Sequence, residues 1–135
     1  SMQQPAPPPD FHIHPNGFDS TRPTAQMMGR YQPWHDGHTA LFKRIIETEA
    51  DQVFIMIRHM PQDENNPAMP HESIPLIKER LSAEGYEENK HYMIAIVPNI
   101  VNISWGRDVG YSTTQHDLGE EIHSISATKI RNGTV

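Results

Sequence analysis

The sequence contains no cysteine. It therefore offers no disulfide, no catalytic thiol and no thiolate ligand for a metal, and it fits a reducing compartment. Long apolar runs are also missing, because no stretch approaches the roughly 18 consecutive apolar residues of a membrane span. We see no charged-then-apolar signal segment either. We accordingly expect a cytoplasmic protein that makes no membrane contact.

Positive charge is scarce. Lysine and arginine together number 11 against 17 aspartates and glutamates, which gives a formal net charge of -6 at pH 7. A general nucleic-acid binder needs a basic face for the phosphate backbone, so this class of function is disfavoured. A small anionic ligand stays compatible with the composition, because a local cluster of arginine, histidine and helix amides can outweigh a mildly acidic whole.

Proline is abundant but unevenly distributed, since half of the 12 prolines lie in the first 23 residues. Such a segment cannot form a helix or a central strand, and we predict that residues 1–23 are an extended or disordered arm. The rest of the chain, residues 24–135, is long enough for one domain with a buried core.

After this arm, short and nearly continuous apolar runs alternate with amphipathic segments. Strands are predicted at residues 24–29, 51–58, 91–97 and 101–106, and helices at residues 38–50, 73–85 and from 123 onward. This alternation predicts an α/β domain with a doubly wound parallel sheet and helices on both faces. Ligands of such sheets bind beyond the carboxyl ends of the strands.

The stretch GRYQPWHDGH, residues 29–38, lies where the first predicted strand turns into the first predicted helix. A helix N-terminus offers unpaired amides and the positive end of the helix dipole. His35 and His38 can direct their imidazoles at one point there, and Gly37 lets a flat ligand approach the backbone. Arg30 adds a charge whose fork suits phosphate. The stretch predicts an anion site, although His35 alone could simply cap the helix and His38 could be a surface residue.

A second phosphate-binding stretch is predicted near the end of the chain, in ISATKIR, residues 125–131. Ser126 is a good N-cap, which leaves the following amides facing outward. Together with the Thr128 hydroxyl and the Arg131 guanidinium, these amides would form a phosphate cradle. An ordinary capped helix is the alternative.

A third stretch, SWGRDVGY at residues 104–111, closes the fourth predicted strand. Gly106 allows a tight turn, and the Asp108 carboxylate could accept hydrogen bonds from ribose hydroxyls. The alternative is a solvent-exposed turn that contains an Arg–Asp pair.

Together these stretches resemble a known family. GRYQPWHDGH resembles the HxGH signature of the nucleotidyltransferase superfamily, and ISATKIR resembles its ISSTxIR signature, in the expected order. The resemblance covers roughly residues 24–131 and is strongest to archaeal-type nicotinamide mononucleotide adenylyltransferases; glycerol-3-phosphate and phosphonate cytidylyltransferases are similar in outline. It implies a Rossmann-like fold. Two departures are that Ala127 replaces a signature serine, and that the chain stops at Val135, which would cut the closing helix short.

The resemblance implies transfer of AMP or CMP from a nucleoside triphosphate to a small phosphate- or phosphonate-bearing acceptor, with release of pyrophosphate. His35, His38 and Arg30 would be the catalytic residues. The implied nucleotide-binding residues are Gly29, Gly37, Gly106, Asp108, Ser126, Thr128 and Arg131. Mg²⁺ would be carried mainly by the triphosphate, so we assign no residue as a metal ligand.

The acceptor is expected beside the second predicted strand. Arg58 and His59 stand at the carboxyl end of that strand and would face the same crevice as Arg30. The polar loop at residues 60–71 is long enough to close over a compact ligand. Alternatively, Arg58 pairs with Asp63 or Glu64 of this loop at the surface.

Two other functions stay open. One is a catalytically inactive nucleotide sensor of the same fold. The other is a metal-binding domain, in which His12 and His14 would join His35 and His38 around zinc. The sequence leaves the base of the nucleotide, the acceptor and the oligomeric state undecided.

Overall fold

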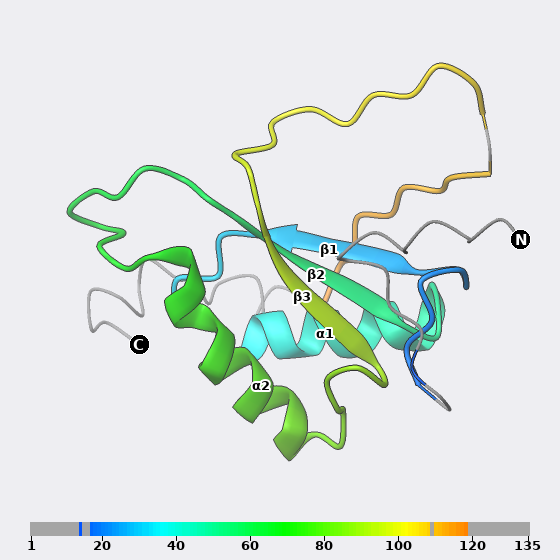
Figure 1. The fold of residues 1–135 in the computed structure, drawn as a ribbon, viewed down its shortest axis with the longest axis horizontal. Helices are drawn as coiled ribbons and strands as arrows, with labels where there is room; N and C mark the ends of the chain where they lie inside the picture. Colours follow the sequence, from blue (N-terminus) through cyan, green and yellow to red (C-terminus); the bar gives the residue numbers. More distant parts are fainter. Residues whose placement is uncertain (1–13, 15–16, 109, 119–135) are drawn as a thin grey trace, which may run out of the picture.

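The computed structural model describes residue 14, residues 17–108 and residues 110–118 (Figure 1). Its elements, in chain order, are β1 (Ala25–Gly29), α1 (Asp36–Thr48), β2 (Val53–Arg58), the 3-10 turn η1 (Pro70–Ser73), α2 (Ile74–Ala83) and β3 (Tyr92–Val97). The predicted alternation of strands and helices is therefore confirmed through residue 97. The predicted last helix, with Ser126, Thr128 and Arg131, lies outside the described residues.

The three strands form one parallel sheet in the order β1-β2-β3. Ala25 lies opposite Val53, and Val53 lies opposite Tyr92, so the strands begin in register. A parallel sheet whose strands are joined by helices confirms the predicted α/β, Rossmann-like class. All three carboxyl ends meet at one edge, which is where ligands bind in such sheets.

Both helices cover the same face of the sheet (Figure 1). The shared core contains Met27, Val53, Ile55, Ile57 and Tyr92 from the sheet, with Phe42 and Ile45 from α1 and Ile77 and Leu81 from α2. This arrangement follows from two successive crossovers of the same hand between neighbouring strands. The second helical layer of a doubly wound domain is not part of the described residues. None of the described helices has the length and apolar character needed to cross a bilayer.

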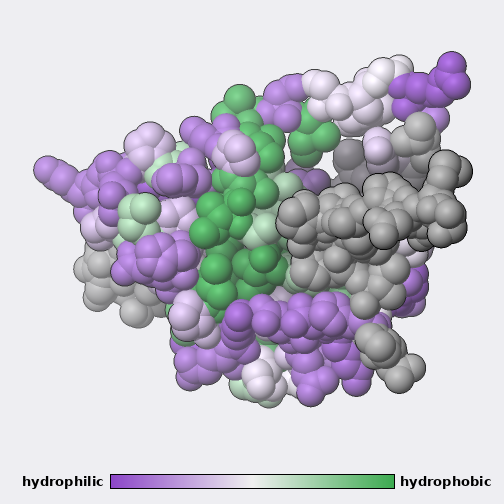
Figure 2. Space-filling view, viewed as in Figure 1, coloured by the Kyte–Doolittle hydropathy of each residue, from purple (hydrophilic) through white to green (hydrophobic). Residues whose placement is uncertain are grey.

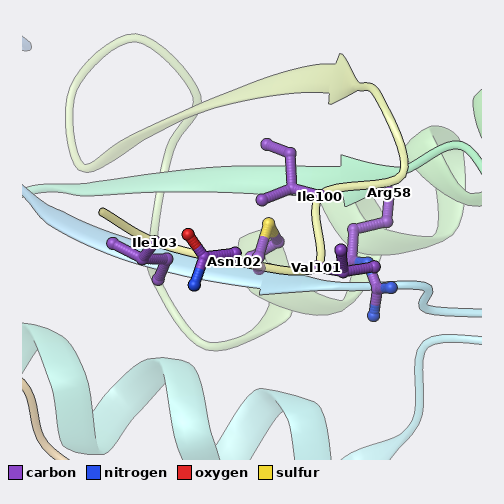
Figure 3. A pocket seen from close by; sticks show the side chains of 6 residues that line it. Arg58, Ile100, Val101, Asn102 and Ile103 are labelled. Carbon is purple, nitrogen blue, oxygen red and sulfur yellow. The ribbon is translucent and has the colours of Figure 1, made fainter.

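The opposite face of the sheet is apolar and only half covered. Side chains at the alternate positions of the strands, such as Met28, Phe54 and Met56, are half-buried. Figure 2 shows an apolar band on the side of the molecule where the sheet faces the viewer in Figure 1. Residues 100–103 cross this face and, with Met28 and Arg58, line an open pocket of about 460 Å³ (Figure 3).

The prediction of a fourth strand at residues 101–106 is wrong. These residues form no strand, and the exposed fractions of Val101, Ile103 and Trp105 are 82%, 59% and 51%. Alternating apolar and polar residues favour a strand only where a neighbouring edge pairs the backbone and one face becomes buried. The segment instead leaves the end of β3 and crosses the sheet without joining a described strand (Figure 3).

The ordered domain begins before residue 24, where we placed its boundary. Phe18 is buried, and the fully buried side chain of Gln52 fixes the segment that follows it. The Gln52 amide Nε2 donates to the Asp19 carbonyl (2.7 Å) and to Thr24 Oγ1 (2.6 Å). Its Oε1 accepts from the Asp19 N–H (3.1 Å) and from Arg22 Nη2 (2.8 Å). Residues 17–23 of the predicted arm therefore pack on the domain.

Candidate functional site

The turn between β1 and α1 is held in place by buried aromatic side chains. Tyr31 adopts a positive φ of 54°, and the Gln32–Pro33 peptide is cis. Trp34 is 1% exposed, and its Nε1 donates to Thr39 Oγ1 at 2.8 Å. The turn thus presents the following histidines from a packed support.

His35 and His38 cap the helix with one ring nitrogen each. His35 is the N-cap, and its Nδ1 accepts a hydrogen bond from the Gly37 N–H at 3.0 Å. The Nδ1 of His38 accepts from the His35 N–H at 3.1 Å. A neutral imidazole whose Nδ1 is an acceptor carries its proton on Nε2. Each histidine therefore keeps one Nε2–H donor for a ligand.

The two imidazole rings lie against each other. Their centroids are 3.8 Å apart and their planes differ by 25°. Burial lowers the pKa of His38 from 6.5 to about 3, and the neighbouring His35 lowers it further in the same direction. Burial also lowers the pKa of His35, while the Asp36 carboxylate opposes that shift. At neutral pH the pair therefore offers two neutral donors rather than two cations.

The amides at the entrance of α1 are largely occupied, contrary to our expectation of unpaired ones. The Gly37 N–H is used by His35 Nδ1, and the N–H groups of His38 and Thr39 donate to the His35 carbonyl at 2.9 and 3.1 Å. The groups that this turn could offer to an anion are consequently the imidazole donors, the helix dipole and Arg30. The capping role foreseen for His35 is real, and it leaves the other nitrogen of the ring available.

The glycines of the motif have different surroundings. A Cβ on Gly29 would lie 2.7 Å from Cε1 of Tyr31, so Gly29 makes room for that ring. Gly37 is buried in the first turn of α1. Of these two predicted nucleotide-binding glycines, Gly29 thus has a clear packing reason for lacking a side chain.

Arg30 follows the end of β1, and Arg58 is the last residue of β2; the two positions are adjacent because Gly29 pairs with Ile57 in the sheet register. Arg30 Nη2 donates to the Pro61 carbonyl at 2.7 Å. Arg58 Nη2 donates to Asn99 Oδ1 at 2.8 Å. In each guanidinium the Nε is buried and has no hydrogen-bond partner within the described part of the chain. Two cations with spare donors thus stand at the edge where a ligand is expected.

The other residues that we expected to bind the acceptor substrate are less enclosed than Arg58. His59 is exposed, and its backbone N–H donates to the Val97 carbonyl at 2.8 Å. The acidic loop residue near a cation is Asp63: the side chain of Asn66 is the main cause that lowers its pKa, and the charge of Arg30 contributes. The partner of Arg58 is Asn99 rather than an acidic residue of this loop. The pocket beside Arg58 is lined by neither His35 nor His38.

The structure does not bring the third predicted stretch to the histidines. Gly106 and Asp108 lie on the exposed segment that follows β3 and arcs away from the sheet (Figure 1). A Cβ on Gly106 would meet nothing within 4 Å, and Asp108 Oδ1 accepts from the Gly110 N–H at 3.0 Å.

A zinc site built from four histidines does not fit this fold. The backbone N–H of His14 donates to the Phe18 carbonyl, and the Phe18 N–H donates to the Asn89 carbonyl just before β3 begins. His35 and His38 stand at the opposite edge of the sheet, after β1 ends. His12 lies outside the described residues, and among the described ones no cluster of three His, Asp or Glu side chains could hold a metal.

Sequence reasoning missed Ser73 as a part of this site. Ser73 is the N-cap residue of α2, but its side chain makes no capping bond. Its hydroxyl instead donates to the Tyr31 carbonyl at 2.6 Å. No local pattern connects two residues 42 positions apart in sequence. Tyr31 itself could have been noticed as a large aromatic residue within the stretch GRYQPWHDGH, residues 29–38.

The comparisons with known proteins agree with a transferase relationship. No family model matches the chain. Over 79 residues it is 30% identical to a nicotinamide-nucleotide adenylyltransferase of Ignicoccus hospitalis. The match takes in 57% of this chain and 46% of that protein, so the chain spans about half the length of the relative. This likeness supports a general nucleotidyltransferase relationship.

Proposed function

We propose that this protein is a nucleotidyltransferase that transfers AMP or CMP from a nucleoside triphosphate to a small phosphate- or phosphonate-bearing acceptor. The observation that carries the proposal is the stacked pair of His35 and His38 at the entrance of α1, whose Nδ1 atoms accept the capping bonds, which leaves each Nε2–H as a donor for a ligand. Arg30 precedes them in the same turn. Pre-organised donors at a helix N-terminus are suited to phosphate oxygens.

The chemistry requires alignment more than acid–base catalysis. An oxygen of the acceptor phosphate attacks the α-phosphorus, the bond from that phosphorus to the bridging oxygen breaks, and pyrophosphate leaves with the bonding electrons. The nucleophile is already anionic, so no serine, cysteine or strong base is needed. The two imidazoles would donate to phosphate oxygens on which negative charge builds, and Arg30 would hold a neighbouring phosphate.

Mg²⁺ would be bound mainly by the phosphates, as is usual for nucleotide sites, and would neutralise their charge. The chain's own residues fit this arrangement. Asp36 is the carboxylate at the entrance of α1, and it pairs with Arg80 of α2 at 3.0 Å. The residues of this turn thus present donors to the phosphates, and the phosphates would present oxygens to the metal.

The acceptor would bind near Arg30 and Arg58. Both arginines stand at the carboxyl ends of adjacent strands and keep a buried Nε without a partner in the described part of the chain, which supports an anion bound between them. The name of the matched relative makes ATP and nicotinamide mononucleotide the first pair to test. By the resemblance of the ISATKIR stretch, Ser126, Thr128 and Arg131 would hold the β- and γ-phosphates.

A pyrophosphate-release assay on the 135-residue chain tests the proposal. ATP and CTP with Mg²⁺ are combined with nicotinamide mononucleotide, glycerol 3-phosphate, 2-aminoethylphosphonate or 2-hydroxyethylphosphonate. Thermal shifts with the same nucleotides report binding, because a ligand of the native state stabilises it by mass action. We expect release with one nucleotide–acceptor pair. Binding without release would assign the protein as a nucleotide sensor, and no nucleotide binding would refute both functions.

A further inference from the structure

Tyr31 adopts an unfavourable backbone conformation in the turn between β1 and α1. A positive φ of 54° is rare for a bulky side chain. Its hydroxyl is buried without a hydrogen-bond partner in the described part of the chain, which is also unfavourable. Burial raises the pKa of this hydroxyl, so it stays protonated. Such strain persists where the surrounding structure enforces it, and it often marks a functional position.

This conformation places the Tyr31 ring against His38. The two rings meet edge to face, with centroids 4.9 Å apart and planes at 81°. Trp34 lies 5.0 Å from the Tyr31 ring and 5.3 Å from the His38 ring. His38 is thus bordered by two aromatic rings, while His35 stacks on it at 3.8 Å. The absent Cβ of Gly29 leaves the space that Tyr31 occupies.

Ser73 holds the backbone of Tyr31 through a hydrogen bond. Its hydroxyl donates to the Tyr31 carbonyl in a buried bond of 2.6 Å, and Ser73 is 7% exposed. Ser73 is the last residue of η1 and so stands at the end of the connection between β2 and α2. Pro61 stands near the beginning of this connection, and its carbonyl accepts from Nη2 of Arg30, the residue before Tyr31. Both ends of the connection are therefore bound to Arg30 and Tyr31, two consecutive residues of the turn between β1 and α1.

We propose that Tyr31 is a positioning residue for His38 and that Ser73 locks Tyr31 in place, so that the loop between β2 and α2 determines the orientation of the His38 imidazole. The catalytic consequence rests on the proposed function. The orientation itself does not, and it can be measured without any substrate.

A purely structural role makes a different prediction. If Tyr31 only filled space, its replacement would change the free energy of unfolding and leave the ring of His38 unaffected. A positioning role requires that the tautomer and the titration of His38 change as well. The charged and titratable groups nearby are His35, Asp36 and, through its ion pair with Asp36, Arg80 of α2. None of them is altered by substitutions at residues 31 or 73.

Nitrogen-15 NMR of the histidine side chains in the full 135-residue chain measures this directly. In the wild type we expect His38 to be the neutral Nε2–H tautomer and to show no titration between pH 8 and about pH 5, because its pKa is held well below the ordinary 6.5. Tyr31→Phe keeps the ring and should keep this signature. Tyr31→Leu removes the ring, and His38 should then show mixed tautomers and a pKa that moves back toward 6.5.

Ser73 provides the second arm of the experiment. Ser73→Ala should shift the His38 ring resonances in the same direction as Tyr31→Leu, and Ser73→Thr, which retains a hydroxyl, should restore them. If Tyr31→Leu does not fold, the Ser73 pair decides. An unchanged tautomer and titration of His38 in the folded Tyr31→Leu protein, or in Ser73→Ala if only that variant folds, would overturn the proposal.

The outcome is separable from that of the proposed function. Wild-type protein that binds no nucleotide, but whose His38 responds to Tyr31→Leu, would retain the positioning role and refute the transferase. Where transfer is observed, Tyr31→Leu and Ser73→Ala should lower kcat more than they raise the nucleotide KM, because a misdirected donor is missed most in the transition state.

Discussion

His35 and His38 stack at 3.8 Å, and each directs its Nδ1 to a backbone N–H of the helix entrance. One side of each ring therefore serves the fold, while the other side carries a proton that a ligand can use. This division would allow two histidines three residues apart to cap a helix and, in the function we propose, also to bind phosphate. It also guides the choice of substitutions, because alanine would remove both roles together.

Asparagine separates the two roles. Its Oδ1 can replace Nδ1 as the acceptor of the capping bond, but it offers no donor at the position of Nε2. We expect His38→Asn and His35→Asn each to remain folded and to lower turnover by roughly a hundredfold or more, as when one pre-organised transition-state donor is lost. Steady-state kinetics and circular dichroism measure this. Near-normal turnover in both variants would exclude the phosphate role.

The stability of the protein should depend on pH through His38. The pKa of His38 is about 3 in the folded protein and near 6.5 when unfolded, so the unfolded chain binds a proton first as the pH falls. The contribution of neutral His38 to the free energy of unfolding is fully present above pH 6.5 and is lost progressively between pH 6.5 and pH 3. We expect the free energy of unfolding in urea to decrease over this range, and to decrease less in His38→Asn. His91, whose pKa burial also lowers, is the same in both proteins. An equal dependence of the free energy of unfolding on pH in the wild type and in His38→Asn would contradict the burial of a neutral His38.

Arg58 should affect the acceptor more than the nucleotide. Its guanidinium stands at the end of β2, next to the strand end that carries Arg30. We expect Arg58→Ala to raise the KM of the acceptor by roughly tenfold to a hundredfold, the size of one lost hydrogen bond to a charged group, about 1.5–3 kcal/mol, with a smaller change in the KM of the nucleotide. Arg44→Ala, on the exposed side of α1, is the matched control. A change confined to the nucleotide KM would move Arg58 to the triphosphate site.

The order of strands and helices through residue 97 could be predicted because hydrophobic periodicity is a local property. The location of GRYQPWHDGH at a strand-to-helix turn followed from that order. The bond between Ser73 and Tyr31 could not be predicted, because it joins residues 42 positions apart and each has a plausible local role of its own. Similarly, residues 101–106 have the composition of a strand, but a strand also needs a partner edge, which no local pattern provides.

The role of Gln52 was missed for a related reason. A glutamine at the start of an apolar run gives no sign that it will be fully buried. We expect Gln52→Ala to lower the free energy of unfolding by about 1–3 kcal/mol, because the fully buried amide loses its hydrogen bonds to Asp19, Arg22 and Thr24. Gln115→Ala, at an exposed position, should have little effect.

A chain that begins at residue 24 should be destabilised to a similar degree as Gln52→Ala. A truncated chain as stable as the full one would mean that residues 17–23 contribute nothing to the stability of the fold.

The hydroxyl of Tyr31 gives the last prediction. It is buried without a partner in the described part of the chain, and an unsatisfied buried polar group costs about 1–3 kcal/mol. Tyr31→Phe removes the hydroxyl and keeps the ring that contacts His38, so we expect the free energy of unfolding to rise by about 1 kcal/mol or more in urea denaturation. Tyr111→Phe is the control, because Tyr111 is 68% exposed and its hydroxyl is hydrated in both states. A loss of stability in Tyr31→Phe would show that this hydroxyl has a hydrogen-bond partner in the folded protein.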